Sequence, residues 1–120
     1  MSSVPKSLHY SLILALTAAL YVNALPGVWH YDDFHSVADN LALRSLANVP
    51  RFFTDPTTFS ANPEMAMYRP VLLVSYAVQY AITGPGVGWW HLGNVMLHGA
   101  NACLGGWIGA ALMGPAGVAA

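Results

Sequence analysis

The sequence predicts an all-α fragment of a polytopic membrane protein, in which an external loop joins two transmembrane helices. Only 8% of the 120 residues are charged and 56% are hydrophobic, whereas charged residues make up about 25% of an ordinary soluble domain. Every charged residue except Lys6 lies between Asp32 and Arg69, so the chain is apolar, then polar, then apolar. A water-facing surface of normal polarity cannot be assembled from this composition.

The first apolar stretch, residues 8–25, forms about 27 Å of helix at 1.5 Å per residue, close to the roughly 30 Å hydrocarbon core of a bilayer. Lys6 lies close to this stretch, whereas Arg51 and Arg69 lie too far away to influence its orientation. We therefore expect the N-terminus in the cytoplasm. The alternative is a signal peptide, with Lys6 in its basic region and cleavage after residues 22–24.

The section between the two spans, residues 26–88, is polar and is expected outside the cytoplasm. Within it, residues 70–82 predict a helix that has a proline in its first turn and ends before Gly84-Pro85-Gly86. This helix is too short to cross a bilayer. We expect it to be juxtamembrane, lying along the membrane surface or packed under the loop.

Shorter helices are expected earlier in the loop. Residues 36–39 match a helix-start box, which predicts a helix over residues 39–47. Asn48 is expected to cap a second helix. The phenylalanines that this second helix would bury are Phe52 and Phe53.

The second apolar stretch, residues 89–113, predicts the second transmembrane helix, which Gly114-Pro115 is expected to end. Residues 115–120 then read as the start of a third apolar segment. We therefore expect the sequence to be the N-terminal part of a longer protein, since a chain ending there would expose backbone groups to lipid. The tryptophans expected to anchor this span are Trp89, Trp90 and Trp107.

Two adjacent carboxylates, Asp32 and Asp33, follow the first span closely and are flanked by aromatic residues. Like charges side by side in a low-dielectric setting oppose ionisation of both groups, which suits a proton acceptor or a metal ligand. The alternative is a structural cap that accepts backbone N–H groups. His30 and His35 could extend a metal site, although histidines near a membrane surface more often act as amphipathic anchors.

Polar residues recur along the second span in steps of three and four, which places them on one face of a helix. They are His91, Asn94, His98 and Asn101, and Gly105 continues the series. Such a stripe indicates either a functional cavity or interhelical hydrogen bonding, and Gly105 with Gly109 favours helix packing. A redox or transport role for the two histidines is a third interpretation.

Four segments follow one another in a characteristic order: YDDFH from Tyr31, NLALRSLANVPRFF from Asn40, Tyr68-Arg69-Pro70 and GWWHLGNVMLHGAN from Gly88. In this order they resemble the N-terminal section of the GT-C membrane glycosyltransferases that use polyprenyl-phosphate sugars, of the TMTC and protein O-mannosyltransferase type. The resemblance covers residues 8–114. In that family the first external loop carries the catalytic carboxylate and a juxtamembrane helix precedes the second span. Bacterial relatives often carry TPR repeats.

The resemblance implies a glycosyltransferase that moves a sugar, with mannose as one candidate, from a polyprenyl-phosphate donor to a protein or glycan hydroxyl. It implies Asp32 as the general base, with Asp33 as the second candidate. Arg69 would offer its guanidinium to the donor phosphate. The other residues implied on the substrate side are His35, Tyr68 and His91.

The expected location is a bacterial inner membrane, with membrane lipid as a partner and the loop in the periplasm. Nucleic acid is excluded as a partner because the chain has no basic cluster. The single cysteine, Cys103, excludes an internal disulfide. The resemblance implies no definite cofactor and leaves a divalent metal ion open, and we expect this piece alone to be inactive. The alternative function is a non-enzymatic membrane scaffold or assembly subunit.

Overall fold

The computed structural model describes residues 5–117, and over that range the backbone forms helices and turns without a strand. The all-α prediction is confirmed. The chain divides into two compact units. We call Pro26–Trp90 the loop unit, and the described parts of Met1–Leu25 and His91–Ala120 the helical pair.

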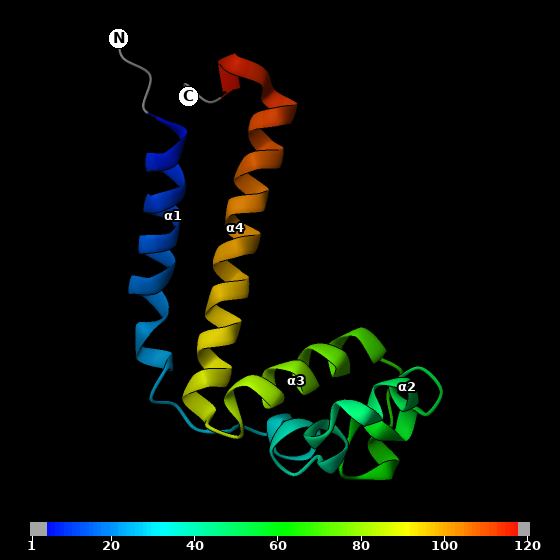
Figure 1. Ribbon diagram of the computed structural model, residues 1–120. Helices are drawn as coiled ribbons and strands as arrows, with labels where there is room; N and C mark the ends of the chain where they lie inside the picture. The colour runs from blue at the N-terminus through cyan, green and yellow to red at the C-terminus, as the bar shows by residue number, and fades with distance from the viewer. Residues whose placement is uncertain (1–4, 118–120) are drawn as a thin grey trace. The chain divides into compact units, whose positions relative to one another are not determined.

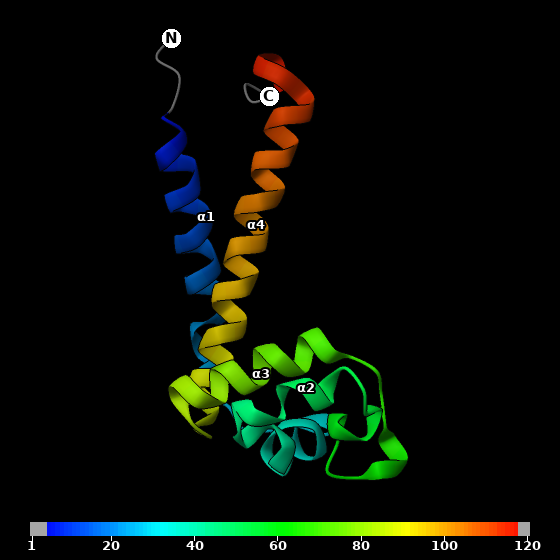
Figure 2. The ribbon, with the colours of Figure 1, turned by 45° about the vertical axis from the view of Figure 1, so that its right-hand side comes forward.

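The helical pair consists of α1, Lys6–Tyr21, and most of α4, Val87–Gly117. Both ribbon views show the two helices side by side and running in opposite directions (Figures 1 and 2). Within residues 5–117, Lys6–Ala24 and Val87–Met113 are long and apolar enough to cross a membrane. Thr17 is the buried residue of the α1 span, and 6% of the α4 span is buried inside the protein. Long helices that are predominantly apolar yet largely unburied support membrane association.

Glycines of α4 allow α1 to come close. A Cβ placed on Gly99 would lie 3.2 Å from Leu14 Cδ2 and 3.6 Å from Thr17 Cγ2, and Thr17 is itself buried. By contrast, Gly105 and Gly109 have no such neighbour within 4 Å. The sequence predicts helix packing at the face that carries Gly105 and Gly109. This is not the face of α4 that contacts α1.

The C-terminal end of α4 differs from expectation. The helix runs on through Gly114-Pro115 to Gly117, where the sequence predicts a break. Proline removes one backbone hydrogen bond, and a membrane helix can bend at such a residue and continue. Residues 118–120, the rest of the predicted third segment, lie outside the described range.

The loop unit has a core of its own, under α3, Pro70–Thr83. In both ribbon views α3 lies against the short turns of this unit, and it contacts α2, Val49–Phe52, and the 3-10 turn Leu41–Arg44 (Figures 1 and 2). Its opposite face is apolar but exposed, at Val71, Val78 and Ile82. The buried apolar side chains of the core are Val37, Leu43, Phe52, Phe59, Leu73, Ala77 and Trp90.

The helix expected over residues 39–47 is absent, and short turns occupy Phe34–Ala38, Leu41–Arg44 and Leu46–Asn48. The buried Asn40 side chain explains the difference. Its Nδ2 donates to the carbonyl oxygens of Ser36, Thr58 and Phe59 at 3.0–3.1 Å. These bonds bind the turns to a distant segment instead of extending them into a helix.

The second short helix, α2, is present but is organised differently from the prediction. Asn48 precedes it without accepting a capping bond, and its Nδ2 donates instead to Ala42 O at 2.9 Å. Phe52 is 1% exposed and Phe53 is 48% exposed, so the predicted burial holds for one of the two. A helix of a single turn cannot direct two successive side chains into the same core.

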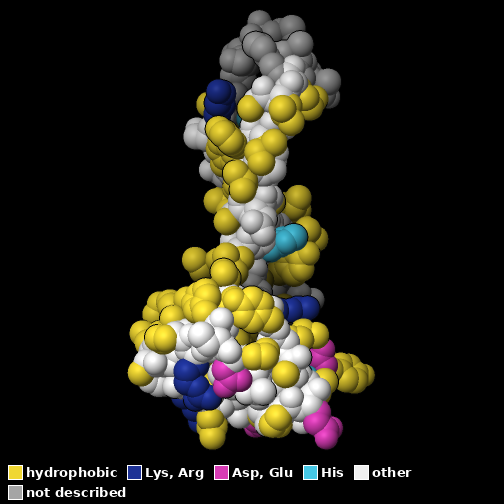
Figure 3. Space-filling model, turned by 90° about the vertical axis from the view of Figure 1, so that its right-hand side faces the viewer, with side chains coloured by type: hydrophobic (Ala, Val, Ile, Leu, Met, Phe, Trp, Pro, Cys, Tyr) yellow, Lys and Arg dark blue, Asp and Glu magenta, His cyan; other side chains and the backbone are white. Residues whose placement is uncertain are grey.

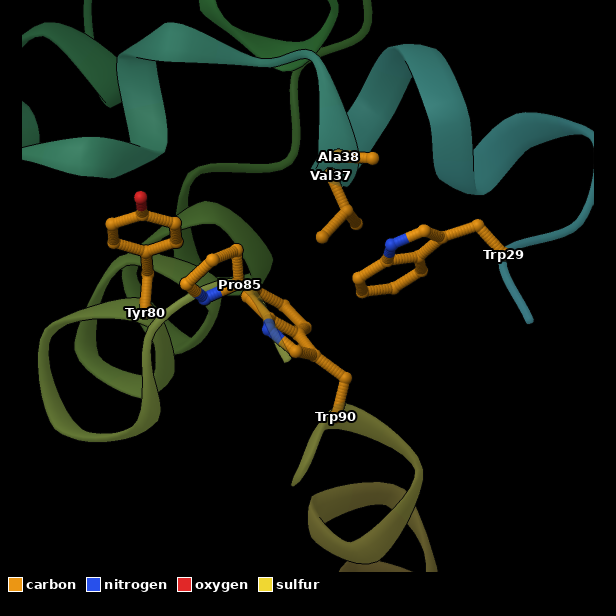
Figure 4. A pocket seen from close by; sticks show the side chains of 6 residues that line it. All are labelled: Trp29, Val37, Ala38, Tyr80, Pro85 and Trp90. Atoms are coloured by element: carbon orange, nitrogen blue, oxygen red, sulfur yellow. The ribbon is translucent and has the colours of Figure 1, made fainter. Parts of the chain in front are cut away.

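Trp90, which the sequence predicts as an interfacial anchor, is instead part of the loop-unit core. Its indole N–H donates to Gly84 O at 3.0 Å, and its ring meets Trp29 and Tyr76 edge-to-face. Beside it lies an apolar pocket of about 60 Å³ (Figure 4). The pocket is lined by Trp29, Val37, Ala38, Tyr80, Pro85 and Trp90.

Candidate active site

The two predicted acids lie on a tight turn at the start of the loop unit. Asp33 N–H donates to His30 O at 2.9 Å, and Phe34 N–H donates to Tyr31 O at 3.3 Å. Between them, Tyr31 has φ +41°, and its side chain is 91% exposed. A left-handed conformation costs a residue with a Cβ about 1–2 kcal/mol, and such strain is concentrated at functional sites. Sequence analysis did not identify Tyr31 as unusual.

Asp32 and Asp33 have different surroundings. Asp33 is half-buried as a residue, and its carboxylate Oδ2 accepts the backbone N–H of His30 at 3.2 Å. The structural-cap interpretation therefore applies to Asp33. The Asp32 side chain is 89% exposed, while its backbone carbonyl accepts the Ser36 hydroxyl at 2.6 Å. Asp32 thus combines a fixed backbone with a carboxylate that a substrate can reach.

His35 lies beside Asp32. Its Nε2 is 3.5 Å from Asp32 Oδ1, and its Nδ1 is 2.9 Å from Ser60 Oγ. The backbone carbonyl of His35 also accepts the Ala61 N–H at 2.7 Å. The sequence did not indicate Ser60, because it is 25 positions away from His35 and only the fold brings the two together.

Arg69 reaches the same part of the loop unit. Its guanidinium carbon lies 5.8 Å from the centre of the Phe59 ring, and Phe59 directly precedes Ser60. A cation over an aromatic face is attracted by the ring quadrupole. The segment Phe59-Ser60 therefore contacts both Arg69 and His35, which links the predicted phosphate-binding cation to the acid turn.

Tyr76 on α3 is a partly buried titratable group of the loop unit that sequence analysis did not single out, and its ring meets Trp90 edge-to-face. Burial raises the pKa of its phenol above the usual 10.0, and the negative charge of Asp33 raises this pKa further, while Arg69 opposes the rise. The phenol therefore stays a neutral hydrogen-bond donor at neutral pH. A tyrosine in an apolar helix looks like a core residue, so the sequence held no signal for it.

Two further residues that the sequence predicts on the substrate side are Tyr68 and His91. The Tyr68 hydroxyl donates to Phe53 O at 3.4 Å, which directs this exposed side chain towards the end of α2. His91 belongs to the helical pair, on α4. Their roles in binding substrate stay predictions.

The metal prediction is also untested. Across residues 5–117, no three His, Cys, Asp or Glu side chains gather in a way that could hold a metal ion. His30 takes part in the acid turn through its backbone. The charged side chains, Lys6 apart, belong to the loop unit, and the face in Figure 3 shows acidic and basic groups on that unit.

Comparison with known proteins gives a distant relationship. The chain is 34% identical over 91 residues to Protein O-mannosyl-transferase TMTC2 of Mus musculus and, to the same extent, to that of Homo sapiens. The match covers 72% of this chain and 11% of the length of either relative. No family model matches the chain, and no solved structure matches it. The likeness supports a distant relationship to a glycosyltransferase.

Proposed function

We propose that the protein is a membrane glycosyltransferase of the GT-C type, which transfers a sugar from a polyprenyl-phosphate donor to a hydroxyl acceptor with Asp32 as the general base. The observation that carries the proposal is the exposed Asp32 carboxylate on a hydrogen-bonded turn, in the same compact unit as Arg69. The relatives' name, a protein O-mannosyl-transferase, makes mannose and a protein hydroxyl the first substrates to test.

The proposed chemistry is a single displacement at the anomeric carbon. The acceptor hydroxyl gives its proton to Asp32 while its oxygen bonds to that carbon. The bond from the anomeric carbon to the donor phosphate oxygen breaks, and polyprenyl phosphate leaves with the electron pair. Arg69 would bind the phosphate oxygens and stabilise the charge that grows on them.

The proposal places the loop unit outside the cytoplasm, at the periplasmic face of a bacterial inner membrane. A polyprenyl chain stays in lipid while its phosphate and sugar lie at the boundary with water. The two apolar helices that flank the loop unit in sequence support the membrane part of this proposal. The N-terminus would then be cytoplasmic.

Replacing Asp32 by Asn in the full-length protein tests the proposal directly. Removing a general base lowers the rate by about 10²–10⁴-fold, so transfer of a labelled sugar from a polyprenyl-phosphate donor should fall by that factor while membrane insertion is retained. The matched control is Asp39→Asn, because Asp39 is an exposed acid of the same segment with no part in the cluster. Unchanged transfer by the Asp32→Asn protein would refute the proposal.

A membrane scaffold is the second candidate function, and the surface of α4 favours it. Asn94, His98 and Asn101 are exposed on this helix, and polar side chains at membrane depth normally bond to other helices. For a scaffold, Asn94→Leu should disrupt assembly of the full-length protein, as measured by cross-linking in membranes. In that case Asp32→Asn should have no effect.

A further inference from the structure

We propose that His35 and Ser60 hold the Asp32 carboxylate in one orientation, with His35 binding Oδ1 through a protonated Nε2 and leaving Oδ2 for the acceptor hydroxyl. This inference rests on the proposed function and deepens it. It makes His35 a positioning residue that acts through Asp32, where the resemblance implied that His35 contacts substrate. It also gives Ser60 a role.

The hydrogen bonds of Ser60 favour the tautomer of His35 that carries its proton on Nε2. Ser60 Oγ accepts the backbone N–H of Asn62 at 2.9 Å and lies 2.9 Å from His35 Nδ1. With the Asn62 N–H already bound to the oxygen, the Ser60 hydroxyl hydrogen can point at Nδ1. A neutral imidazole that accepts at Nδ1 carries its own hydrogen on Nε2.

The surroundings of Nε2 lead to the same tautomer. This nitrogen is buried and has no hydrogen-bond partner closer than the Asp32 carboxylate, 3.5 Å away. With the hydrogen on Nδ1, the lone pair of Nε2 would face a negatively charged oxygen. With the hydrogen on Nε2, the same atoms form a charge-assisted contact.

The two ends of this contact differ in rigidity, which makes His35 the residue that orients Asp32. Ser60 is 6% exposed, and Ala61 N–H fixes the backbone of His35, so the imidazole is held from behind. The Asp32 side chain is exposed and, without His35, would sample several rotamers. A separation of 3.5 Å exceeds the usual 2.9 Å or so, and contacts of this kind shorten when substrate binds.

The tautomer of His35 is the first test, and it does not depend on catalysis. The 120-residue chain, labelled with ¹⁵N-histidine in detergent micelles, should show His35 with its proton on Nε2 at a pH where the ring is neutral. The His35→Asn protein identifies the signals by their loss. Ser60→Ala should mix the two tautomers. A predominant Nδ1–H form in the unmodified chain would overturn the inference, whatever the outcome for sugar transfer.

The second test measures whether Ser60 acts through Asp32 in the full-length protein. Ser60→Ala should lower kcat about 10- to 100-fold with KM for the donor unchanged, as is typical when the support of a reacting group is removed. Ser60→Thr, which keeps the hydroxyl, should recover most of the rate. Ser45→Ala is the matched control, since the Ser45 hydroxyl only accepts the nearby Ala47 N–H.

The double variant separates positioning from a general loss of structure. If Ser60 acts through Asp32, Ser60→Ala should cause no further loss in the Asp32→Asn protein. Independent, multiplying losses would overturn the inference. If the expected tautomer is found but Asp32→Asn leaves sugar transfer unchanged, the hydrogen-bond arrangement stands and the proposed function fails.

Discussion

The loop unit and the helical pair are stabilised in different ways. In the loop unit, polar side chains begin the short turns by accepting a backbone N–H two residues ahead, and apolar side chains close a core beneath α3. In the helical pair, contact depends on small residues such as Gly99, while large apolar side chains point outward. The side chains that begin turns in the loop unit are Asn40, Ser45, Asp55 and Asn62.

This difference shows which part of the sequence specifies its own structure. The loop unit satisfies many of its backbone groups through named side chains, so its conformation depends on individual residues. The helical pair satisfies its backbone within each helix and leaves its apolar surface to the surrounding medium. Substitutions in the loop unit should therefore have local, residue-specific effects. In the helical pair, the effect of a substitution should depend on whether it lies at the contact between the two helices.

The largest effect should come from the core of the loop unit, through two neighbouring phenylalanines. Phe52→Ala removes a side chain that is 1% exposed and should destabilise the unit by about 3–5 kcal/mol. Phe53→Ala removes an exposed ring and should change stability by about 0.5 kcal/mol or less. Hydrogen exchange of the backbone amides of α3 would measure both, and equal losses would contradict this description of the core.

An intermediate effect is expected in the helical pair. Gly99→Leu places a side chain against Leu14 and Thr17 and should weaken the contact by about 1–3 kcal/mol. Gly105→Leu, which meets open space, is the matched control. The readout is disulfide cross-linking in membranes between cysteines replacing Ile13 and Gly106, in a Cys103→Ser background.

For the helical pair, less cross-linking with Gly99→Leu and unchanged cross-linking with Gly105→Leu would agree with the observed face. If instead Gly105→Leu lowered cross-linking and Gly99→Leu left it unchanged, α1 would contact the Gly105–Gly109 face, which the sequence predicts as a helix-packing face. The experiment therefore decides between the two faces of α4.

The smallest effect is expected at an exposed turn of the loop unit. Hydrogen bonds from the Thr57 side chain, from the Thr57 backbone and from Arg51 lower the pKa of Asp55 below its usual 3.8. Because the folded pKa is the lower one, Asp55 stabilises the unit above pH 3.8, and this contribution is lost as the pH falls through the folded value. Denaturation of Asp55→Asn against the unmodified chain should show a small deficit near neutral pH that disappears in acid. A deficit that persists in acid would contradict this origin.

The elements that the sequence predicted best depend on local signals. For α3, Pro70 at the first turn and the Gly84-Pro85-Gly86 segment after the last turn are both visible in the sequence, and the observed helix, Pro70–Thr83, lies within one residue of the predicted end. The turns before α2 were mispredicted because their shape depends on Asn40, whose partners Thr58 and Phe59 lie 18 and 19 positions away.

The candidate site likewise combines contacts that local sequence spacing predicts with contacts between distant residues that it does not. The proximity of Asp32 and His35 follows from their spacing of three, which one helical turn brings together. The contact of Ser60 with His35, and that of Arg69 with Phe59, exist only after the chain has folded. Residue type and the family resemblance therefore indicated the charged groups, but they could not identify the residues that hold them.

The Asn40 amide also has a chemical consequence for the lifetime of the protein. Asparagine is among the residues most prone to slow damage, since its amide can hydrolyse to a carboxylate. At this position the change would replace a nitrogen that donates to three carbonyl groups with an oxygen that repels them. Deamidation of this one side chain would thus loosen the segment that carries Ser60. Samples stored warm should be checked for this change by mass spectrometry.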